Sequence, residues 1–184
     1  DIFIFMGDNV YGDDRITGKL DKLSKAYTKQ KTKIPFAELK ETNEIHAIWD
    51  DHDYGKNDGG AEYKYKQGAK NLFLDFWNIS LEDPRRNRDG IYYETKKITK
   101  KGLLQIIFLD TRYFRSPLKR TDERGAPGKE RYLPDNSPEK TFLGEEQWNW
   151  LSNKLDEDAD IRIIVSSIQT VSYTHLTLPT KVEV

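Results

Sequence analysis

Residues 44–53 read Glu-Ile-His-Ala-Ile-Trp-Asp-Asp-His-Asp, a short apolar run followed at once by an acidic block. A run of this length that ends in polar residues favours a buried β-strand. Residues 2–9, Ile-Phe-Ile-Phe-Met-Gly-Asp-Asn, have the same form. In open α/β sheets, ligands bind just beyond the carboxyl ends of the strands. The two stretches therefore predict parallel strands with a functional site at their ends.

The remaining pattern alternates between helix and strand periodicity. Strands and helices in alternation are typical of the α/β and α+β classes, and we expect one of these. A long polar loop is expected at residues 116–141, and loops of that length inside a domain are usually functional or mobile. Helices are predicted at residues 16–31, 63–77 and 144–155, and further strands at residues 91–93, 103–109 and 161–165.

Composition excludes several classes of protein. The chain has 184 residues, and its 30 Lys and Arg against 31 Asp and Glu give a net charge of −1, so no overall field favours sequence-specific nucleic-acid binding. Aromatic residues make up 12% of the chain, which argues against wholesale disorder. No stretch reaches the ~20 apolar residues that span a bilayer, so no transmembrane segment is expected. The chain has no cysteine, which excludes disulfides and a thiol nucleophile.

The acidic block concentrates four carboxylates and one imidazole in residues 50–58: Asp50, Asp51, His52, Asp53 and Asp58. Such crowding of like charge raises carboxylate pKa values unless a cation is bound. The alternative is an exposed acidic loop with a solvated histidine. In combination with a second polar cluster at a neighbouring strand end, the metal interpretation is the better one.

That second cluster is residues 7–14, in which Tyr11 follows Asp8 by three residues. A carboxylate and a phenol can offer two oxygen ligands to one metal, and hard cations such as Fe(III) favour them. The alternative is a solvated turn with a local Asx hydrogen bond. A third cluster, Asp110-Thr111-Arg112, could orient a ligand and hold a phosphoryl oxygen through Arg112, or it could be an Asp–Arg pair that fixes a loop.

Other signals are weak. The basic run at residues 85–88 could attract an anionic substrate, although solvated charge is the favoured interpretation. Ser166 and Ser167 lie outside any Gly-x-Ser-x-Gly elbow and have no obvious base partner. The sequence contains no phosphate-binding Walker loop and no dinucleotide fingerprint.

Several blocks, in this order, resemble the PhoD-like (alkaline phosphatase D) branch of the calcineurin-like metallophosphoesterases. They are Gly-Asp-Asn-Val-Tyr at 7–11, Trp-Asp-Asp-His-Asp-Tyr-Gly at 49–55 with Asn-Asp at 57–58, Leu-Asp-Thr-Arg-Tyr at 109–113, and Leu-Gly-Glu-Glu-Gln-Trp at 143–148. The resemblance covers residues 1–169. It implies a β-sandwich flanked by helices and a metal-dependent alkaline phosphatase that hydrolyses small phosphomonoesters or phosphodiesters.

The resemblance also implies roles for individual residues. Asp8 is expected to bridge two metals, Tyr11 to bind ferric iron, Asp51 to take the place of a metal-ligating Asn, and Asn57 to contact metal or phosphate. His52 is expected near the leaving group, with Arg112 as a weaker candidate for phosphate binding. The expected cofactors are two or more metal ions, Fe(III) with Ca(II) or another divalent cation. Export from the cytoplasm is expected by resemblance, although this chain carries no signal peptide.

Two departures from the family pattern predict that the chain is incomplete at both ends. The first metal motif of the family lies upstream of residues 2–6, and a Gly-Asp-x-His type motif lies downstream of residue 169. We therefore expect a partial domain at 1–169 and a foreign or disordered tail at 170–184. Two alternatives to a metal-dependent alkaline phosphatase stay open: a diester hydrolase of phosphodiesterase or phospholipase type, and a non-catalytic fragment that lacks part of the metal site.

Overall fold

A computed structural model describes residues 1–14, 16–17, 19–123, 127 and 131–169. The strands are β1 (Ile2–Met6), β2 (Glu44–Ile48), β3 (Tyr93–Thr99), β4 (Gly102–Phe108) and β5 (Ile161–Val165). The helices are α1 (Asp21–Lys31), α2 (Ile34–Thr42), α3 (Asp51–Tyr54), α4 (Lys66–Phe76), the short 3₁₀ helix η1 (Pro84–Arg86) and α5 (Gly144–Leu155). The predicted α/β (α+β) class is confirmed.

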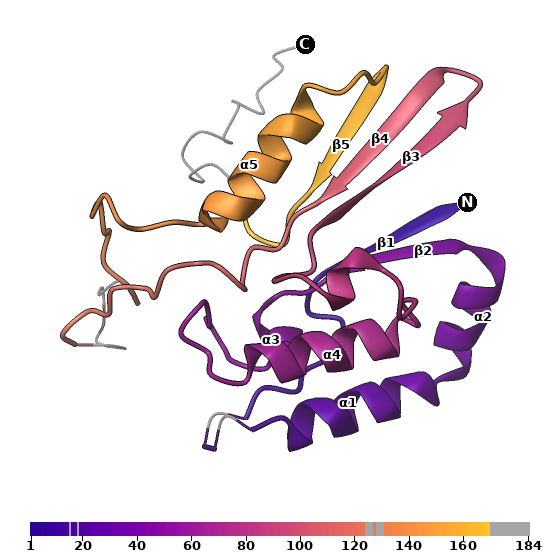
Figure 1. Ribbon diagram of the computed structural model, residues 1–184. Coiled ribbons are helices and arrows are strands. Elements are labelled where there is room, and N and C mark those ends of the chain that lie inside the picture. The colour runs from indigo at the N-terminus through magenta and orange to yellow at the C-terminus, as the bar shows by residue number, and fades with distance from the viewer. Residues whose placement is uncertain (15, 18, 124–126, 128–130, 170–184) are drawn as a thin grey trace, which may run out of the picture.

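The strands form two sheets that face each other (Figure 1). β1 pairs with β2 in parallel, while the second sheet has the order β3-β4-β5, antiparallel and then parallel. Side chains of both sheets meet in one buried cluster, which includes Ile48 of β2, Phe108 of β4 and Val165 of β5. This cluster makes the two sheets a β-sandwich, as expected.

Helices cover the outer face of each sheet. Phe5 of β1 and Ala47 of β2 contribute to a cluster with α1, α2 and α4, in which Phe73 and Phe76 of α4 are buried. On the other side, Leu151 of α5 packs with alternate residues of β4. The two-residue period of the strands explains the arrangement, because successive side chains point to the sandwich core and to the helices in turn.

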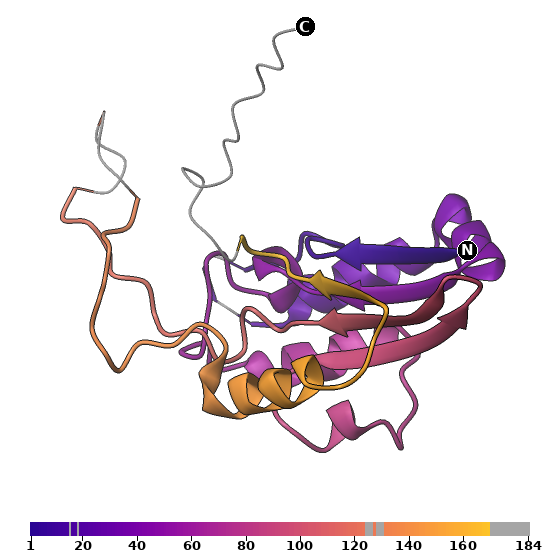
Figure 2. The same ribbon diagram turned by 90° about the horizontal axis from the view of Figure 1, so that it is seen from above.

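β1, β2, β4 and β5 all end on the same side of the molecule (Figure 1, Figure 2). The polar clusters found in the sequence follow these strands. The connection between β4 and α5, which contains the predicted long loop, extends beyond the same end (Figure 2). The fold therefore gathers residues that lie more than 100 positions apart in the chain at one edge.

Two elements, α1 and β3, differ from their predicted bounds. Helix α1 begins at Asp21 rather than near Ile16, because the Asp14 carboxylate accepts hydrogen bonds from the backbone of Ile16 and Thr17 and holds a local turn instead. Strand β3 begins at Tyr93 and runs through the lysine-rich segment to Thr99, whereas the predicted strand covered residues 91–93. Two of these lysines, Lys96 and Lys97, form ion pairs with Glu157 and Glu44, which offsets their poor strand propensity.

Candidate metal centre

The parallel pairing of β1 with β2 brings the first two polar clusters together. Met6 lies opposite Ile48 in the register, so residues 7–8 and 50–52 leave the sheet side by side. Gly7 has a φ of 107°, and a Cβ at this position would lie 2.6 Å from the Cβ of Asp50. Only glycine permits this close approach. The turn then holds Asp8 at a φ of 51°, a left-handed conformation that aspartate tolerates better than most residues.

Residues 51–54 form the one-turn helix α3, not the acidic loop that was the alternative. Asp50 and Asp53 make a reciprocal capping box at its start, and Asp53 Oδ1 accepts a 2.6 Å hydrogen bond from the Asp50 backbone. Asp53 is fully buried, and burial raises its pKa well above the ordinary value, although Asn9 donates two hydrogen bonds to its other oxygen. Asp53 is therefore a structural carboxylate that fixes the direction of α3.

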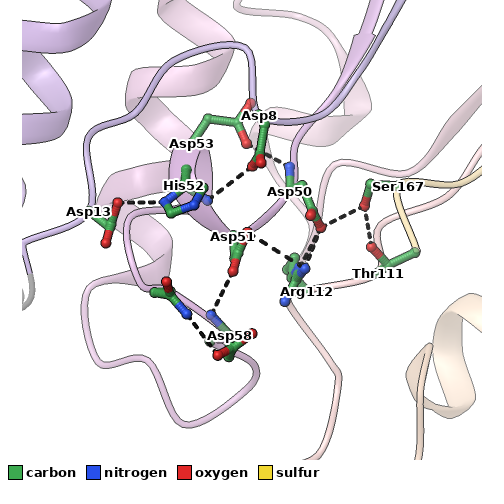
Figure 3. Close-up of polar contacts among 12 residues, drawn as sticks. Asp8, Asp13, Asp50, Asp51, His52, Asp53, Asp58, Thr111, Arg112 and Ser167 are labelled. Carbon is green, nitrogen blue, oxygen red and sulfur yellow. Dashed lines mark hydrogen bonds and ion pairs between the residues drawn. The ribbon is translucent and has the colours of Figure 1, made fainter. Parts of the chain in front are cut away.

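The helix places Asp51 and His52 against Asp8 (Figure 3). One ligand atom from each of these three residues lies within 4.8 Å of the others. Asp8 Oδ1 accepts a hydrogen bond from the His52 backbone at 3.3 Å, and Asp51 Oδ2 accepts one from the Asp58 backbone at 2.7 Å. Two carboxylate oxygens and an imidazole nitrogen are suitable donors for a divalent or ferric cation. We call Asp8, Asp51 and His52 the acidic triad below.

His52 is oriented by a partner that the sequence analysis did not single out. Its Nδ1 lies 2.6 Å from Asp13 Oδ1 (Figure 3), which leaves Nε2 for other contacts. Burial lowers the pKa of His52, but the hydrogen bond to Asp13 and the negative charges of Asp51, Asp13 and Asp8 outweigh it and raise the pKa above its ordinary value. A carboxylate behind the imidazole is the usual way in which metal-site histidines are held. No pattern in the sequence indicates this pair, whose members lie 39 positions apart.

The other two predicted ligands lie next to the triad. Tyr11 is 70% exposed, its Oη is 3.4 Å from Asp8 Oδ2, and its ring centroid is 4.4 Å from that of His52. The negative charge of Asp8 raises the pKa of Tyr11. Asn57 is half-buried and donates a 2.7 Å hydrogen bond to Asp58 Oδ2. Its link to the triad runs through the Asp58 backbone.

Arg112 comes from the strand end of β4 and reaches the same centre. Its Nε and Nη2 lie 2.6 Å and 2.5 Å from Asp50 Oδ1, and Nη2 is 3.8 Å from Asp51 Oδ1 (Figure 3). Burial raises the pKa of Asp50, and the Arg112 charge opposes that shift. The buried Nη1 of Arg112 has no hydrogen-bond acceptor among the residues that the structure describes. A buried, unsatisfied guanidinium nitrogen beside the triad is a feature of an anion-binding site.

Ser167, which follows β5, supports this arginine. Its Oγ donates to Asp50 Oδ1 at 3.0 Å and lies 2.6 Å from Thr111 Oγ1. The hydroxyl is thus engaged in a polar network. This agrees with the sequence analysis, in which Ser167 had no base partner that would make it a nucleophile. Both Asp50 and Ser167 were visible in the sequence as polar residues after strands, but their role depends on contacts between three strand ends.

The sequence model of the PhoD-like phosphatase family matches residues 1–181 of this chain. The chain belongs to the PhoD-like phosphatase family. Its members are phosphoric ester hydrolases that depend on metal ions, and the acidic triad supplies a donor set that fits a metal ion. Searches of curated proteins and of solved structures gave no match.

Membrane spanning and the C-terminal tail were also predicted from the sequence. No helix in the described part of this PhoD-like phosphatase has the length and apolar composition needed to cross a bilayer. The prediction for residues 170–184 falls outside the described residues.

In the third polar cluster of the PhoD-like chain, Asp110-Thr111-Arg112, the aspartate and the arginine have different roles. Asp110 is fully buried, and burial raises its pKa. Its two carboxylate oxygens accept hydrogen bonds from Trp49 Nε1 and from the backbones of Ile91, Arg112 and Tyr113, at 2.8–2.9 Å. Asp110 therefore fixes the loop, as the alternative interpretation held, and Arg112 is the member of the cluster that faces the triad.

The basic run at residues 85–88 is neither solvated charge nor an open anion site. Arg85 pairs with Asp83 at 2.8 Å and lies over the Tyr93 ring, while Arg88 lies over the Tyr92 ring. Arg86 pairs with Asp75 at 2.6 Å. These guanidinium groups attach the segment after α4 to the rest of the fold.

Proposed function

We propose that this chain hydrolyses small phosphoesters with metal ions held by Asp8 and Asp51, as in a metallophosphoesterase. The observation that carries the proposal is the acidic triad at the ends of two neighbouring parallel strands. A bound cation would act as a Lewis acid toward the phosphoryl group and would increase the acidity of water. Fe(III) with Ca(II) or another divalent cation is the proposed cofactor set.

Tyr11 and Asn57 are proposed as additional oxygen donors. Tyr11 is the better supported of the two, because its hydroxyl already lies beside the Asp8 carboxylate. A hard cation bound between these oxygens would favour the phenolate over the phenol, because it would offset the negative charge of Asp8 that raises the pKa of Tyr11. Asn57 would contribute through its contact with Asp58.

His52 is proposed to act beside the metal rather than as its ligand, and to protonate the leaving-group oxygen from Nε2. Asp13 fixes the orientation of the ring through Nδ1, and its hydrogen bond favours the protonated imidazole. Arg112 is proposed to bind a phosphoryl oxygen through Nη1, the nitrogen that lacks an acceptor. Asp50 and Ser167 hold the guanidinium in place for that contact.

Asp8→Ala and His52→Ala test the proposal in a protein that contains the chain. Each should lower kcat/KM for p-nitrophenyl phosphate and for its bis-ester, by about a hundredfold or more, as is typical for the loss of a group that stabilises transition-state charge or transfers a proton. Metal content separates the two roles, because Asp8→Ala should lose metal and His52→Ala should keep it. Wild-type turnover in either variant would contradict the proposal.

We also propose a cellular location and a class of substrate for this chain. Export to the cell exterior or periplasm fits the family resemblance, and a small phosphoester is the expected partner. The fragment alternative predicts poor metal affinity and no turnover for this chain alone, and it is tested by the same metal analysis.

A further inference from the structure

A cavity of about 490 Å³ lies beside the acidic triad. Three segments line it: the segment after β1 at Asp13, Asp14, Ile16 and Thr17, the segment between α3 and α4 at residues 56–57 and 62–65, and the connection between β4 and α5 at Arg120, Arg131 and Tyr132. Sites for small molecules usually measure roughly 300–1,000 Å³. The cavity thus has room for a part of a substrate beyond the reacting phosphate.

The cavity is joined to the triad by direct contacts. Asp13, in its wall, is the residue that holds His52 Nδ1 at 2.6 Å. Asn57, also in the wall, bonds to Asp58, whose backbone donates to Asp51 at 2.7 Å. The cavity therefore adjoins the triad on the side where Asp13 holds His52.

The part of the wall that belongs to the connection between β4 and α5 is attached to Asp58. Tyr132 Oη donates a 2.7 Å hydrogen bond to Asp58 Oδ2, and Arg131 forms an ion pair with that carboxylate at 2.9 Å. The backbones of Arg120 and Tyr132 pair as an isolated antiparallel bridge. These contacts hold part of the long polar loop over the cavity, so its side chains there have defined positions.

The charges of the cavity wall are not balanced. Lys56 pairs with Glu62 at 2.7 Å, and Asp14 pairs with Lys22 at 3.5 Å. Lys64 and Arg120 have no carboxylate partner among residues 1–169 as far as the structure describes them. Both side chains are exposed, and Lys64 Nζ lies 4.8 Å from the centroid of the Tyr65 ring.

Aromatic rings form the rest of the recognition surface. Tyr65 and Tyr132 line the cavity, and the buried Tyr63 ring supports Tyr65 from behind, edge to face at a centroid distance of 6.0 Å. Phenol rings stack on flat groups and donate hydrogen bonds, while an unpaired lysine or arginine attracts an anion. The two features together match a ligand that carries a ring and a negative charge.

We propose that this cavity is the leaving-group subsite, and that it selects phosphoesters whose leaving alcohol carries a ring with a further anionic substituent. This inference rests on the proposed phosphoester hydrolysis. In the reaction, water oxygen forms the new bond to phosphorus, the bond from phosphorus to the leaving oxygen breaks, and that oxygen takes up a proton from His52. Lys64 and Arg120 act only on the far, anionic end of the alcohol.

Two matched substrates test the subsite: 4-carboxyphenyl phosphate, whose leaving group has a ring and a charge, and phenyl phosphate, which lacks the charge. Phosphate release gives the ratio of kcat/KM for the two. The ratio in the wild type should exceed that in Lys64→Ala/Arg120→Ala by about tenfold, because loss of two exposed charge contacts costs about 1.4 kcal/mol. Taking the ratio cancels the intrinsic reactivity of the two esters.

The matched control is Lys100→Ala/Lys101→Ala, which removes the same charge from the turn between β3 and β4. It should keep the wild-type ratio. An equal ratio in the wild type and the Lys64/Arg120 variant would overturn the subsite, and so would an equal loss in the control.

A binding measurement separates this inference from the proposed function. Calorimetric titration with 4-carboxyphenylphosphonate and with phenylphosphonate, neither of which can be hydrolysed, needs no turnover. Tighter binding of the carboxylated ligand that depends on Lys64 and Arg120 supports the subsite even if no ester is cleaved. Equal affinity for the two phosphonates overturns it, even in an active enzyme.

Discussion

Asp51 and Asp110 are both buried aspartates at strand ends, yet their surroundings give them different roles. Asp110 is surrounded by nitrogen donors, four of which point at its two oxygens. Among the described residues, Asp51 receives one backbone hydrogen bond, has the Arg112 guanidinium at 3.8 Å, and lies beside the carboxylate of Asp8. A carboxylate with all its acceptor positions in use maintains structure, whereas one with free positions beside another carboxylate is available to a cation.

Replacing each aspartate by asparagine should separate the two roles. Asp110→Asn turns an NH₂ group toward N–H donors, so it should lower the free energy of unfolding by about 3 kcal/mol. Asp51→Asn removes a repulsive charge and should leave the metal-free protein equally or more stable. Urea denaturation of both variants in chelator measures this, and a larger loss in Asp51→Asn than in Asp110→Asn would contradict the assignment.

Ser167 provides a second test at the residue scale. Ser167→Ala removes the hydrogen bond that supports Asp50 behind Arg112, and a bond of about 1 kcal/mol corresponds to about fivefold in kcat/KM. Because Arg112 is proposed to bind a phosphoryl oxygen, inhibition by inorganic phosphate should weaken as well.

The control for that experiment is Ser166→Ala. Ser166 donates to the Ile168 backbone and makes no contact with Asp50 in the described structure. It should retain wild-type kinetics and phosphate inhibition. If both serine variants behaved alike, Ser167 would have no special role in positioning Arg112.

At the scale of elements, periodicity predicted most of the fold and local hydrogen bonds explain what it did not. β1, β2, α5 and β5 were found within a residue or so of their expected bounds, because each has a strong apolar pattern. α3 was missed because a four-residue helix has too little sequence for a period, and its capping box, Asp50 and Asp53, looked like part of an acidic loop. The lysine-rich part of β3 was missed because its ion pairs come from distant segments.

The same distinction applies to the candidate site. The positions of Asp8, Asp51 and His52 after strands could be predicted from the sequence. The pairing of Asp13 with His52 could not be predicted from the sequence. Neither could the role of Gln147 in holding the backbone of Asp110. Gln147 of α5 is buried and bonds to both the backbone N–H and the carbonyl of Asp110, at 2.8 Å each. Long-range pairs of this kind have no signature in a single sequence.

An ion-pair group that joins α5 to β3 allows a pH test. Hydrogen bonds from Lys154 and Lys96 lower the pKa of Glu157 to about 2. Since the folded pKa lies below the unfolded value, the contribution is present above about pH 4.5 and is lost as the pH falls toward 2. Glu157→Gln should therefore lower the urea midpoint at pH 7 and converge with the wild type near pH 2.

Asp158→Asn is the matched control, since it removes one charge from an exposed neighbour with no ion pair in the described part of the chain. Its midpoint should follow the wild type at every pH. A gap between Glu157→Gln and the wild type that stays constant down to pH 2 would be inconsistent with the low pKa of Glu157.

At the scale of the whole molecule, the sandwich serves to bring four strand ends to one edge. Polar groups that follow β1, β2, β4 and β5 meet there, and Tyr132 of the connection between β4 and α5 bonds to Asp58 beside them. Sequence patterns predicted this edge as the site, but only the packing of the two sheets explains how Arg112 and Ser167 reach Asp50. Hydrolysis by this edge of the sandwich therefore requires that the edge bind metal.

Metal content after equilibrium dialysis tests that claim most directly. The wild-type chain, Asp8→Ala/Asp51→Ala and the surface control Asp156→Ala/Asp158→Ala are dialysed against the same metal solution and analysed by elemental mass spectrometry. The account predicts near-stoichiometric metal in the wild type and the control, and loss of it in Asp8→Ala/Asp51→Ala. Equal metal content in all three proteins, whether high or absent, would contradict it.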